Sequence, residues 1–325
     1  MIKGMRFHEF GGPEVLRWEE VEVAVPAAGE VRIRHEAIGV NFVDVYQRDG
    51  LYKVPLPSVA GNEGAGVVEA VGEGVTLVKP DDRVVYAGRI GSYCEARTIP
   101  ADRLCILPDG VTFEQGAAMM LKGLTVQYLI RRTCRVQRGD TVVFHAAAGG
   151  VGTIACQWLK LLGAKVIGTA GSDEKCKLAL QNGADFCINY RTENIVERVR
   201  EITNGEGVPV VYDSVGKDTF ESSLKCLRPF GLLVSFGNAS GPVPPVDLGL
   251  LAQNGSLYIT RPTLATYIAK QADLEAMAKE LFDNVLSGNV KIDISQRYQL
   301  KDAAQAHRDL EARKTTGSSI LLPGT

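Results

Sequence analysis

The stretch that decides the fold is Val143-Phe144-His145-Ala146-Ala147-Ala148-Gly149-Gly150-Val151-Gly152. Its apolar start is typical of a buried strand, and its small residues are typical of a tight turn. The amphipathic run 153–162 follows at once and predicts a helix. A dinucleotide pyrophosphate binds to this order of strand, turn and helix. Small residues let backbone N–H groups approach the phosphates, and the helix N-terminus adds partial positive charge.

The glycine spacing in this turn reads Ala147-x-Gly149-x-x-Gly152, so alanine replaces the first glycine of the usual fingerprint. A single match of this kind is a weak signal, but here the flanking strand and helix are also present. We therefore expect Gly149, Gly150, Val151 and Gly152 to contact a dinucleotide. The alternative is a tight strand–helix turn without a ligand.

Length and composition limit the possible classes of protein. The chain has 325 residues, 45% hydrophobic and 23% charged, with a formal net charge of −2, which suits two ordinary globular domains and gives no general attraction to nucleic acid or membrane. Residues 1–6 lack the apolar core of a signal peptide, and no apolar run is long enough for a membrane span. The seven cysteines are scattered without a C-x-x-C pair, which indicates free thiols in the cytoplasm.

The order of elements predicts an α/β protein of two domains. A β-rich first third includes strands at 30–40, 67–71 and 83–86, and helices follow at 114–120 and 125–132. From residue 141 strands alternate with helices, which predicts a doubly wound, six-stranded parallel sheet. Its strands are expected at 141–145, 165–169, 186–188, 209–213, 231–236 and 256–260, and its helices at 153–162, 173–182, 192–203 and 218–228. Helices at 274–287 and 301–314 and a strand at 318–322 end the chain. We expect domains at 1–124 and 125–262, with 263–325 returning to the first.

A second motif identifies a family. The run Gly61-Asn62-Glu63-Gly64-Ala65-Gly66-Val67-Val68-Glu69-Ala70-Val71-Gly72 resembles the G-x-E-x-x-G-x-V-x-x-V-G signature of medium-chain dehydrogenases/reductases. Four shorter pieces resemble the zeta-crystallin-like quinone oxidoreductase branch: 41–44, 122–125, 212–216 and 235–238. At 81–84 the sequence has Asp-Asp-Arg-Val, where the family usually has glycine before the second aspartate.

This resemblance implies a GroES-like catalytic domain, a Rossmann domain, and reduction of small quinones by NADPH in the interdomain cleft. It also implies a homodimer joined through the last Rossmann strands, here residues 256–260.

The positions that match the catalytic zinc ligands of the family are Asn41, Asn62 and Lys122. None carries a thiolate or an imidazole, the usual zinc ligands, and a lysine ammonium repels a cation. The structural zinc lobe of the family needs four clustered cysteines, but only Cys94 and Cys105 fall in that region. We therefore expect no metal. A quinone needs no Lewis acid because it is electron-poor and gains aromaticity when it accepts hydride.

The end of the second Rossmann strand favours NADPH over NADH. NAD-binding folds carry an acidic residue there, but the matching position here is Ala170 or Gly171. Resemblance assigns the 2′-phosphate to Ser172, Lys175 and Tyr190, with Arg191 close by. Two other interpretations stay open. Ser172 and Lys175 could be a helix cap and a solvated helix face, or Asp173 could replace the missing acidic residue.

The family places further residues in the active site. Resemblance assigns Asn41, Tyr46 and Tyr52 to the nicotinamide and the substrate, since tyrosine offers an apolar wall and a hydroxyl donor. It assigns further cofactor contacts to Lys122, Thr125, Phe236, Gly237, Asn238 and Arg313. The plainer reading is packing for the tyrosines and an ordinary surface residue for Arg313. We expect Glu63 to support the domain junction and His145 to be a strand residue.

Two other functions remain open. Activated alkenes such as enones also accept hydride at a conjugated system. Relatives of the zeta-crystallin type are also reported to bind AU-rich RNA. The arginines at 131, 132, 135 and 138 form no RNA-binding motif and are more typical of a solvated helix end, so RNA binding is the less favoured of these alternatives.

Overall fold

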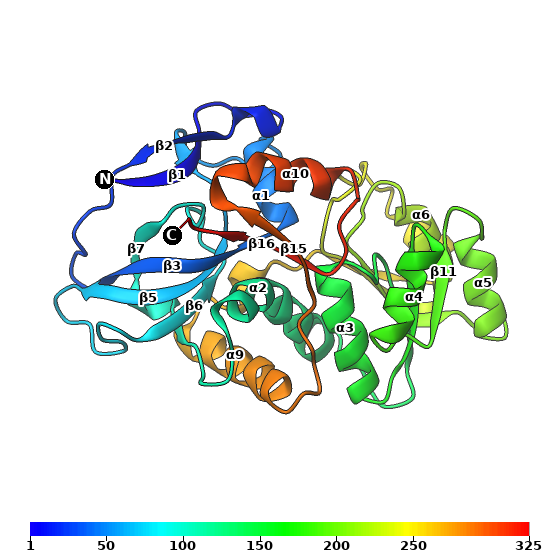
Figure 1. The fold of residues 1–325 in the computed structure, drawn as a ribbon. Coiled ribbons are helices and arrows are strands. Elements are labelled where there is room, and N and C mark those ends of the chain that lie inside the picture. Colours follow the sequence, from blue (N-terminus) through cyan, green and yellow to red (C-terminus); the bar gives the residue numbers. More distant parts are fainter. Residues whose placement is uncertain (325) are drawn as a thin grey trace. The chain divides into compact units, whose positions relative to one another are not determined.

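The computed structural model describes residues 1–324, which divide into two compact units. Of the described residues, unit 1 comprises 1–124, 267–286 and 292–324, and unit 2 comprises 125–266 and 287–291. Figure 1 shows the elements of both units. Within the described residues, no helix is long and apolar enough to cross a membrane.

Unit 2 is built on a parallel sheet with the strand order β11-β10-β9-β12-β13-β14. Numbered within the sheet, this order is 3-2-1-4-5-6, the arrangement of a dinucleotide-binding fold, so the predicted fold class is confirmed. The strands are β9 (Thr141–Phe144), β10 (Lys165–Ala170), β11 (Phe186–Asn189), β12 (Val208–Asp213), β13 (Leu227–Ser235) and β14 (Tyr258–Thr260). The helices are α3 (Gly150–Leu161), α4 (Asp173–Gln181), α5 (Ile195–Ile202), α6 (Phe220–Cys226), α7 (Gly249–Gln253) and α8 (Leu264–Tyr267).

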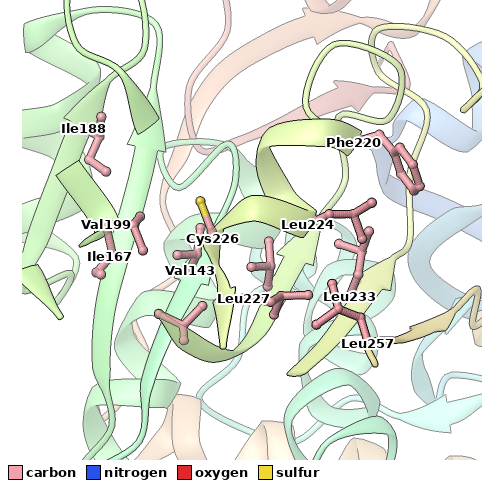
Figure 2. Close-up of a cluster of buried hydrophobic side chains, with 12 residues drawn as sticks. Val143, Ile167, Ile188, Val199, Phe220, Leu224, Cys226, Leu227, Leu233 and Leu257 are labelled. Carbon is pink, nitrogen blue, oxygen red and sulfur yellow. The ribbon is translucent and has the colours of Figure 1, made fainter. Parts of the chain in front are cut away.

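The core of unit 2 explains why these residues form a sheet covered by helices. Val143, Ile167 and Ile188 of three adjacent strands are buried together with Leu224 of α6 (Figure 2). Continuous apolar runs of this kind are typical of parallel strands that are covered on both faces. The burial of these side chains supplies most of the stability of such a sheet.

Several boundaries in unit 2 differ from the prediction by a few residues, and local sequence explains two of them. The helix expected to reach residue 228 ends at Cys226, because Leu227 already pairs with Val208 and proline at 229 cannot continue a helix. The last strand begins at Tyr258 instead of residue 256, because Ser256 adopts a left-handed φ of 55°.

Unit 1 contains a three-stranded sheet, β2-β1-β4, and a seven-stranded sheet in which β7 pairs with β3 beside the path β15-β16-β3-β5-β6-β8. The strands are β1 (Ile2–Phe7), β2 (Arg17–Val21), β3 (Glu30–Val40), β4 (Ser58–Val59), β5 (Glu63–Val71), β6 (Arg83–Ala87), β7 (Ala96–Pro100), β8 (Cys105–Ile106), β15 (Ile294–Gln299) and β16 (Ser318–Leu322). The helices are η1 (Pro13–Val15), α1 (Phe42–Arg48), η2 (Ala101–Arg103), α9 (Gln271–Leu286), η4 (Leu300–Asp302) and α10 (Ala303–Glu311). Helix α2 (Phe113–Tyr128) and the π turn η3 (Leu129–Thr133) lead from unit 1 into unit 2.

The prediction of two separate helices at 114–120 and 125–132 is wrong, because α2 is continuous from Phe113 to Tyr128. Gly123 does not break this helix. A Cβ at this position would lie 2.5 Å from the Leu281 side chain of α9, so glycine permits close packing of two helices.

The strands missed by the sequence analysis are mostly short or half-exposed. Exposure alternates along β15, and β2 has no buried residue, so neither shows a strong apolar pattern. The predicted strand 67–71 begins earlier, at Glu63, in the glycine-rich part of the signature motif. A Cβ at Gly66 would lie 1.9 Å from the carbonyl oxygen of Arg34, so this glycine allows close strand pairing. Asp81, where the family usually has glycine, adopts a φ of 72° in the turn before β6.

Candidate active site

The turn between β9 and α3 depends on one glycine. A Cβ at Gly152 would lie 2.4 Å from the carbonyl oxygen of Ala146 and 2.6 Å from Cα of Ala147, so any side chain would force the turn apart. A Cβ at Gly149 would meet only the Ala146 oxygen, at 3.3 Å. Ala146 itself carries the left-handed φ of 54°. The turn therefore brings the first N–H groups of α3 to the end of β9 without side chains in between.

Three of the predicted cofactor residues lie together at the ends of β10 and β11. A Cβ at Gly171 would lie 2.5 Å from the hydroxyl oxygen of Tyr190, so the tyrosine tip lies over this glycine. Ser172 caps α4 and accepts a hydrogen bond from the backbone N–H of Lys175 at 3.3 Å. The serine is thus a helix cap at the place where a 2′-phosphate would lie, and Lys175 is in the first turn of the same helix.

Asp173 is the residue that could have favoured NADH. Its Oδ1 accepts a hydrogen bond of 2.7 Å from the Asn189 side chain at the end of β11. This bond holds the carboxylate toward β11. The residues at this edge therefore fit a ribose that carries a phosphate better than a ribose that needs an acidic partner.

The ends of β12 and β13 complete this edge of unit 2. A Cβ at Gly237 would lie 2.3 Å from the carbonyl oxygen of Ser214, and Arg261 donates a hydrogen bond of 2.8 Å to the Gly237 carbonyl. The ring of Phe236 packs 5.9 Å from that of Phe144, between ring centroids. Phe236, Gly237 and Asn238 thus follow the carboxyl end of β13, on the side of β9 where the strand order reverses. Ligands of open α/β sheets bind at such a switch point.

His145 is a buried structural residue. Ser223 donates its hydroxyl proton to Asp213 at 2.7 Å, so it accepts the Nε2–H of His145 at 3.0 Å. Nδ1 of His145 then accepts from the Thr169 hydroxyl at 2.9 Å. Burial lowers the pKa of His145. The side chain is a neutral link between β10 and α6 and lies directly after the end of β9, and no local pattern indicates its partner 78 residues away.

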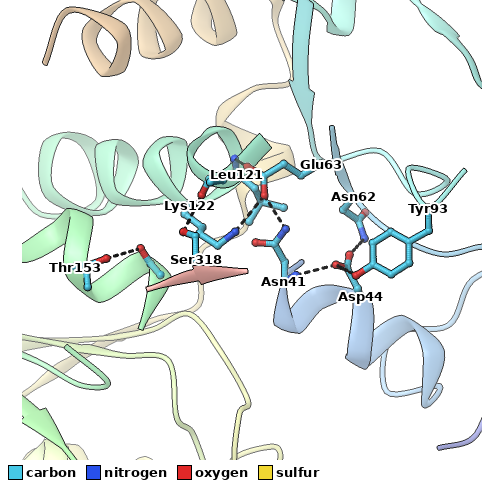
Figure 3. Close-up of polar contacts among 11 residues, drawn as sticks. Asn41, Asp44, Asn62, Glu63, Tyr93, Leu121, Lys122, Thr153 and Ser318 are labelled. Atoms are coloured by element: carbon cyan, nitrogen blue, oxygen red, sulfur yellow. Dashed lines mark hydrogen bonds and ion pairs between the residues drawn. The ribbon is translucent and has the colours of Figure 1, made fainter. Parts of the chain in front are cut away.

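In unit 1, the predicted site residues Asn41 and Lys122 both bond to Glu63 (Figure 3). Oε2 of Glu63 accepts from the Asn41 amide at 2.8 Å and from the Lys122 ammonium at 3.3 Å, while Oε1 accepts from the backbone N–H of Leu121 at 2.7 Å. The Glu63 side chain is fully buried. It therefore fixes both residues, a supporting role that matches its predicted structural character.

A second buried carboxylate, Asp44, was not predicted to organise the site. It accepts from the Asn62 amide at 2.7 Å, from the Asn41 backbone at 2.8 Å and from the Tyr93 hydroxyl at 2.9 Å (Figure 3). Tyr93 in turn lies 3.1 Å from Nε2 of His307, which is 214 residues away in the sequence. Burial raises the pKa of Asp44 to about 6, although its three donors act in the opposite direction.

We expect the free energy of unfolding to decrease between about pH 7.5 and about pH 5. Burial lowers the pKa values of His35 and His307 from 6.5 to about 3, so in this window only the unfolded chain binds these protons. Asp44 acts in the opposite direction, because its raised pKa makes the folded chain the stronger proton binder below pH 6. These two histidines outweigh the one carboxyl group, and His145, whose pKa burial also lowers, adds to the loss, so the net loss should be at least about 2–3 kcal/mol. Urea unfolding at both pH values measures it. Equal or greater stability at the lower pH would contradict this account.

The two predicted tyrosines lie against each other. Tyr46 of α1 is buried, Tyr52 is 39% exposed, and their rings meet edge to face with centroids 5.3 Å apart. The backbone N–H of Tyr52 donates to the carbonyl of Tyr46 at 2.7 Å. The pair is thus a rigid aromatic corner with one exposed ring.

Thr125 and Arg313 are the remaining predicted site residues. Thr125 is buried on α2, in unit 2. Arg313 belongs to unit 1, directly after α10, and adopts a left-handed φ of 55°. Apart from Thr125 and Arg313, the structure thus groups the predicted residues in two sets, one at the carboxyl edge of the parallel sheet and one around Glu63 and α1. Within residues 1–324, no group of three or more His, Cys, Asp or Glu side chains could hold a metal ion.

Comparisons with known proteins identify the family. Residues 27–130 match the model of the alcohol dehydrogenase GroES-like domain, and residues 150–283 match that of the zinc-binding dehydrogenases. A quinone oxidoreductase of Pseudomonas aeruginosa is 56% identical over 99% of this chain and all of its own length. The crystal structure of Escherichia coli quinone oxidoreductase complexed with NADPH has 53% identity and a TM-score of 0.97, and covers 99% of this chain and 100% of that one.

A relative with a different name is also close. A 2-haloacrylate reductase of a Burkholderia species is 44% identical over 99% of both chains. The identities and coverage of these relatives confirm the resemblance seen in the signature motif. The chain therefore belongs to the quinone oxidoreductase family of the medium-chain dehydrogenases/reductases.

Proposed function

We propose that this protein reduces small quinones with NADPH, by hydride transfer and without a metal. The observation that carries the proposal is the edge of the parallel sheet. There Gly152 permits a tight turn whose backbone N–H groups are not covered by side chains. Ser172, Lys175 and Tyr190 lie where an NAD-binding fold has an acidic residue. The full-length similarity to a quinone oxidoreductase that was crystallised with NADPH supports the same function.

The cofactor would be held mainly by backbone N–H groups and by one group of side chains that includes a lysine. The N–H groups of the turn at 149–152 would bind the pyrophosphate, helped by the partial positive charge of α3. Ser172, Lys175 and Tyr190 would bind the 2′-phosphate. Lys122, Thr125, Phe236, Gly237, Asn238 and Arg313 are the further cofactor contacts that family membership supports. When bound, NADPH supplies the hydride.

The quinone would lie against Asn41, Tyr46 and Tyr52. The Tyr46–Tyr52 corner offers an apolar face and hydroxyl donors, and Glu63 holds the Asn41 amide in a single orientation. Donors that are fixed before the reaction stabilise the negative charge that develops on the quinone oxygen. The reduced oxyanion is a modest base, so water or a tyrosine hydroxyl can protonate it. No obligate general acid is needed.

Substitutions of Tyr52 should separate its ring from its hydroxyl. Tyr52→Phe keeps the aromatic wall and removes one donor, so kcat/KM for quinone should fall about fivefold, which corresponds to about 1 kcal/mol. Tyr52→Ala should cost more because the wall is lost. Steady-state kinetics with NADPH and a small quinone measure both. A thousandfold loss in Tyr52→Phe with intact NADPH binding would reveal an obligate general acid and contradict the proposed chemistry.

Reduction of activated alkenes is the second candidate, and the 44% identity to a 2-haloacrylate reductase favours it. A haloacrylate is a conjugated acid whose double bond can accept hydride. Hydride transfer to carbon leaves a carbanion, which needs a proton delivered in place. Assays of quinones and 2-haloacrylates with the same enzyme distinguish the two candidates, and a general-acid effect in Tyr52→Phe would favour the alkene.

We further propose a cytoplasmic homodimer joined through β14. This strand is one of the two edges of the parallel sheet within the described residues, and Tyr258 on it is 61% exposed. Pairing of two such edges would cover both. All seven cysteines are free thiols, which suits a reducing compartment. Light scattering at micromolar concentration should give twice the mass of one chain, and Tyr258→Arg should shift it toward the monomer. A wild-type monomer would contradict the dimer.

A further inference from the structure

The residue that follows α10 by two positions has an unfavourable backbone. Arg313 adopts a φ of 55°, a left-handed conformation that L-residues disfavour and glycine adopts freely. Its N–H donates to the Leu310 carbonyl, and the next N–H, of Lys314, donates to Asp309, so the chain turns sharply here. A strained non-glycine residue persists where the surroundings fix it. The direction of the Arg313 side chain is therefore set by how the end of α10 is held.

The end of α10 is held by a buried arginine of α1. Glu311, the last residue of α10, accepts two hydrogen bonds from the Arg48 guanidinium, at 2.8 Å and 2.9 Å. The Arg48 side chain is 1% exposed, and that of Glu311 is 35% exposed. A bidentate pair of this kind fixes both distance and angle between the two helices.

Arg48 is itself fixed from two further sides. Its Nε donates to the Gly11 carbonyl at 3.0 Å. Its Nη1, which also bonds to Glu311, lies 3.2 Å from Nδ1 of His307. Burial lowers the pKa of His307 to about 3, so the ring is neutral. Its Nδ1 accepts from Arg48, and its Nε2–H then donates to the Tyr93 hydroxyl. The hydrogen bonds continue through Tyr93 to Asp44 and the Asn41 backbone.

We propose that the ion pair between the buried Arg48 and the partly exposed Glu311 positions Arg313 for the cofactor, although neither member of the pair is assigned to hold it. This inference rests on the proposed role of Arg313 as a cofactor contact. Arg48 also lies two positions after Tyr46 on α1, so the same ion pair links the helix of the substrate tyrosine to the end of α10. Arg48 and Glu311 are thus positioning residues.

The test is a double-mutant cycle measured by cofactor binding instead of catalysis. Glu311→Gln keeps a polar side chain but removes the charge, and should raise the Kd of NADPH about threefold to tenfold. In an Arg313→Ala background the same change should have no further effect, because the residue that it positions is gone. NADPH fluorescence titration gives all four affinities.

Two control variants distinguish the loss of positioning from a general effect of the charge change. Glu311→Gln leaves Arg48 buried without a counter-ion, so the double variant Arg48→Met with Glu311→Gln removes both charges and should reproduce the loss of affinity. Asp283→Asn in an exposed ion pair of α9 makes the same charge change and should leave the Kd unchanged. Thermal unfolding verifies that each variant is folded.

The outcomes separate the positioning role from the proposed function. The positioning role would be overturned if Glu311→Gln weakened NADPH binding equally in the presence and absence of Arg313. It would also be overturned if neither Glu311→Gln nor Arg313→Ala alone weakened NADPH binding. No effect of Arg313→Ala alone would remove Arg313 from the cofactor site, and the inference with it. None of these readings depends on whether the substrate is a quinone, because no substrate is present.

Discussion

Gly152→Ala should weaken NADPH binding by about a hundredfold and also destabilise unit 2. The new Cβ would lie 2.4 Å from the Ala146 oxygen and 2.6 Å from backbone atoms of Ala147, so the turn must open. A shifted turn no longer presents the N–H groups of α3, and a loss of about 3 kcal/mol corresponds to about a hundredfold in affinity. Fluorescence titration and thermal unfolding measure the two effects.

Gly149→Ala is the matched control for this prediction. Its Cβ would meet only the Ala146 oxygen, at 3.3 Å, and its φ of −83° suits any residue. Thermal stability should therefore hardly change, and any loss of affinity would come from the cofactor meeting the added methyl group. If Gly152→Ala bound NADPH as tightly as the wild type, the turn would not be the phosphate site.

Lys175→Ala should weaken NADPH binding about tenfold to a hundredfold and leave NADH binding nearly unchanged. A charge-assisted contact with the 2′-phosphate is worth about 1.5–3 kcal/mol, and NADH lacks that phosphate. Ser172→Ala should act in the same direction but less strongly, with an additional loss of helix capping.

The comparison of the two cofactors is the internal control for Lys175. Equal weakening of NADPH and NADH would mean that the residue supports the loop instead of the phosphate. No change in either would move the role to Tyr190 or Arg191. Preference for NADH in the wild type would point to Asp173, despite its hydrogen bond to Asn189.

The sequence predicts the parallel sheet well because its strands are buried on both faces and read as apolar runs. Its strands at Thr141, Lys165 and Phe186 begin where expected. The sequence predicts edge strands such as β15 poorly, because half-exposed strands carry polar residues on one face. The gap predicted between the helices at 114–120 and 125–132 includes Gly123, which in the structure allows close helix packing inside one continuous helix.

The candidate site was predictable where residues are close in sequence. Gly149 and Gly152 belong to one motif, and Ser172 and Lys175 to one helix turn. The bonds of Asp44 to Tyr93, and of Arg48 to Glu311, join residues 49 and 263 positions apart, so no local pattern could indicate them. Such contacts depend on the detailed three-dimensional fold. A motif predicts only the fold class and not the individual long-range contacts.

The central claim is most directly tested by steady-state reduction of a small quinone series, with NADPH and NADH compared and a 2-haloacrylate assayed in parallel. This account predicts that quinone is reduced with a kcat/KM for NADPH at least about tenfold above that for NADH, as expected for one charge-assisted contact. It predicts much slower reduction of the haloacrylate. Reduction of the haloacrylate alone, or quinone reduction that runs equally well with NADH, would contradict it.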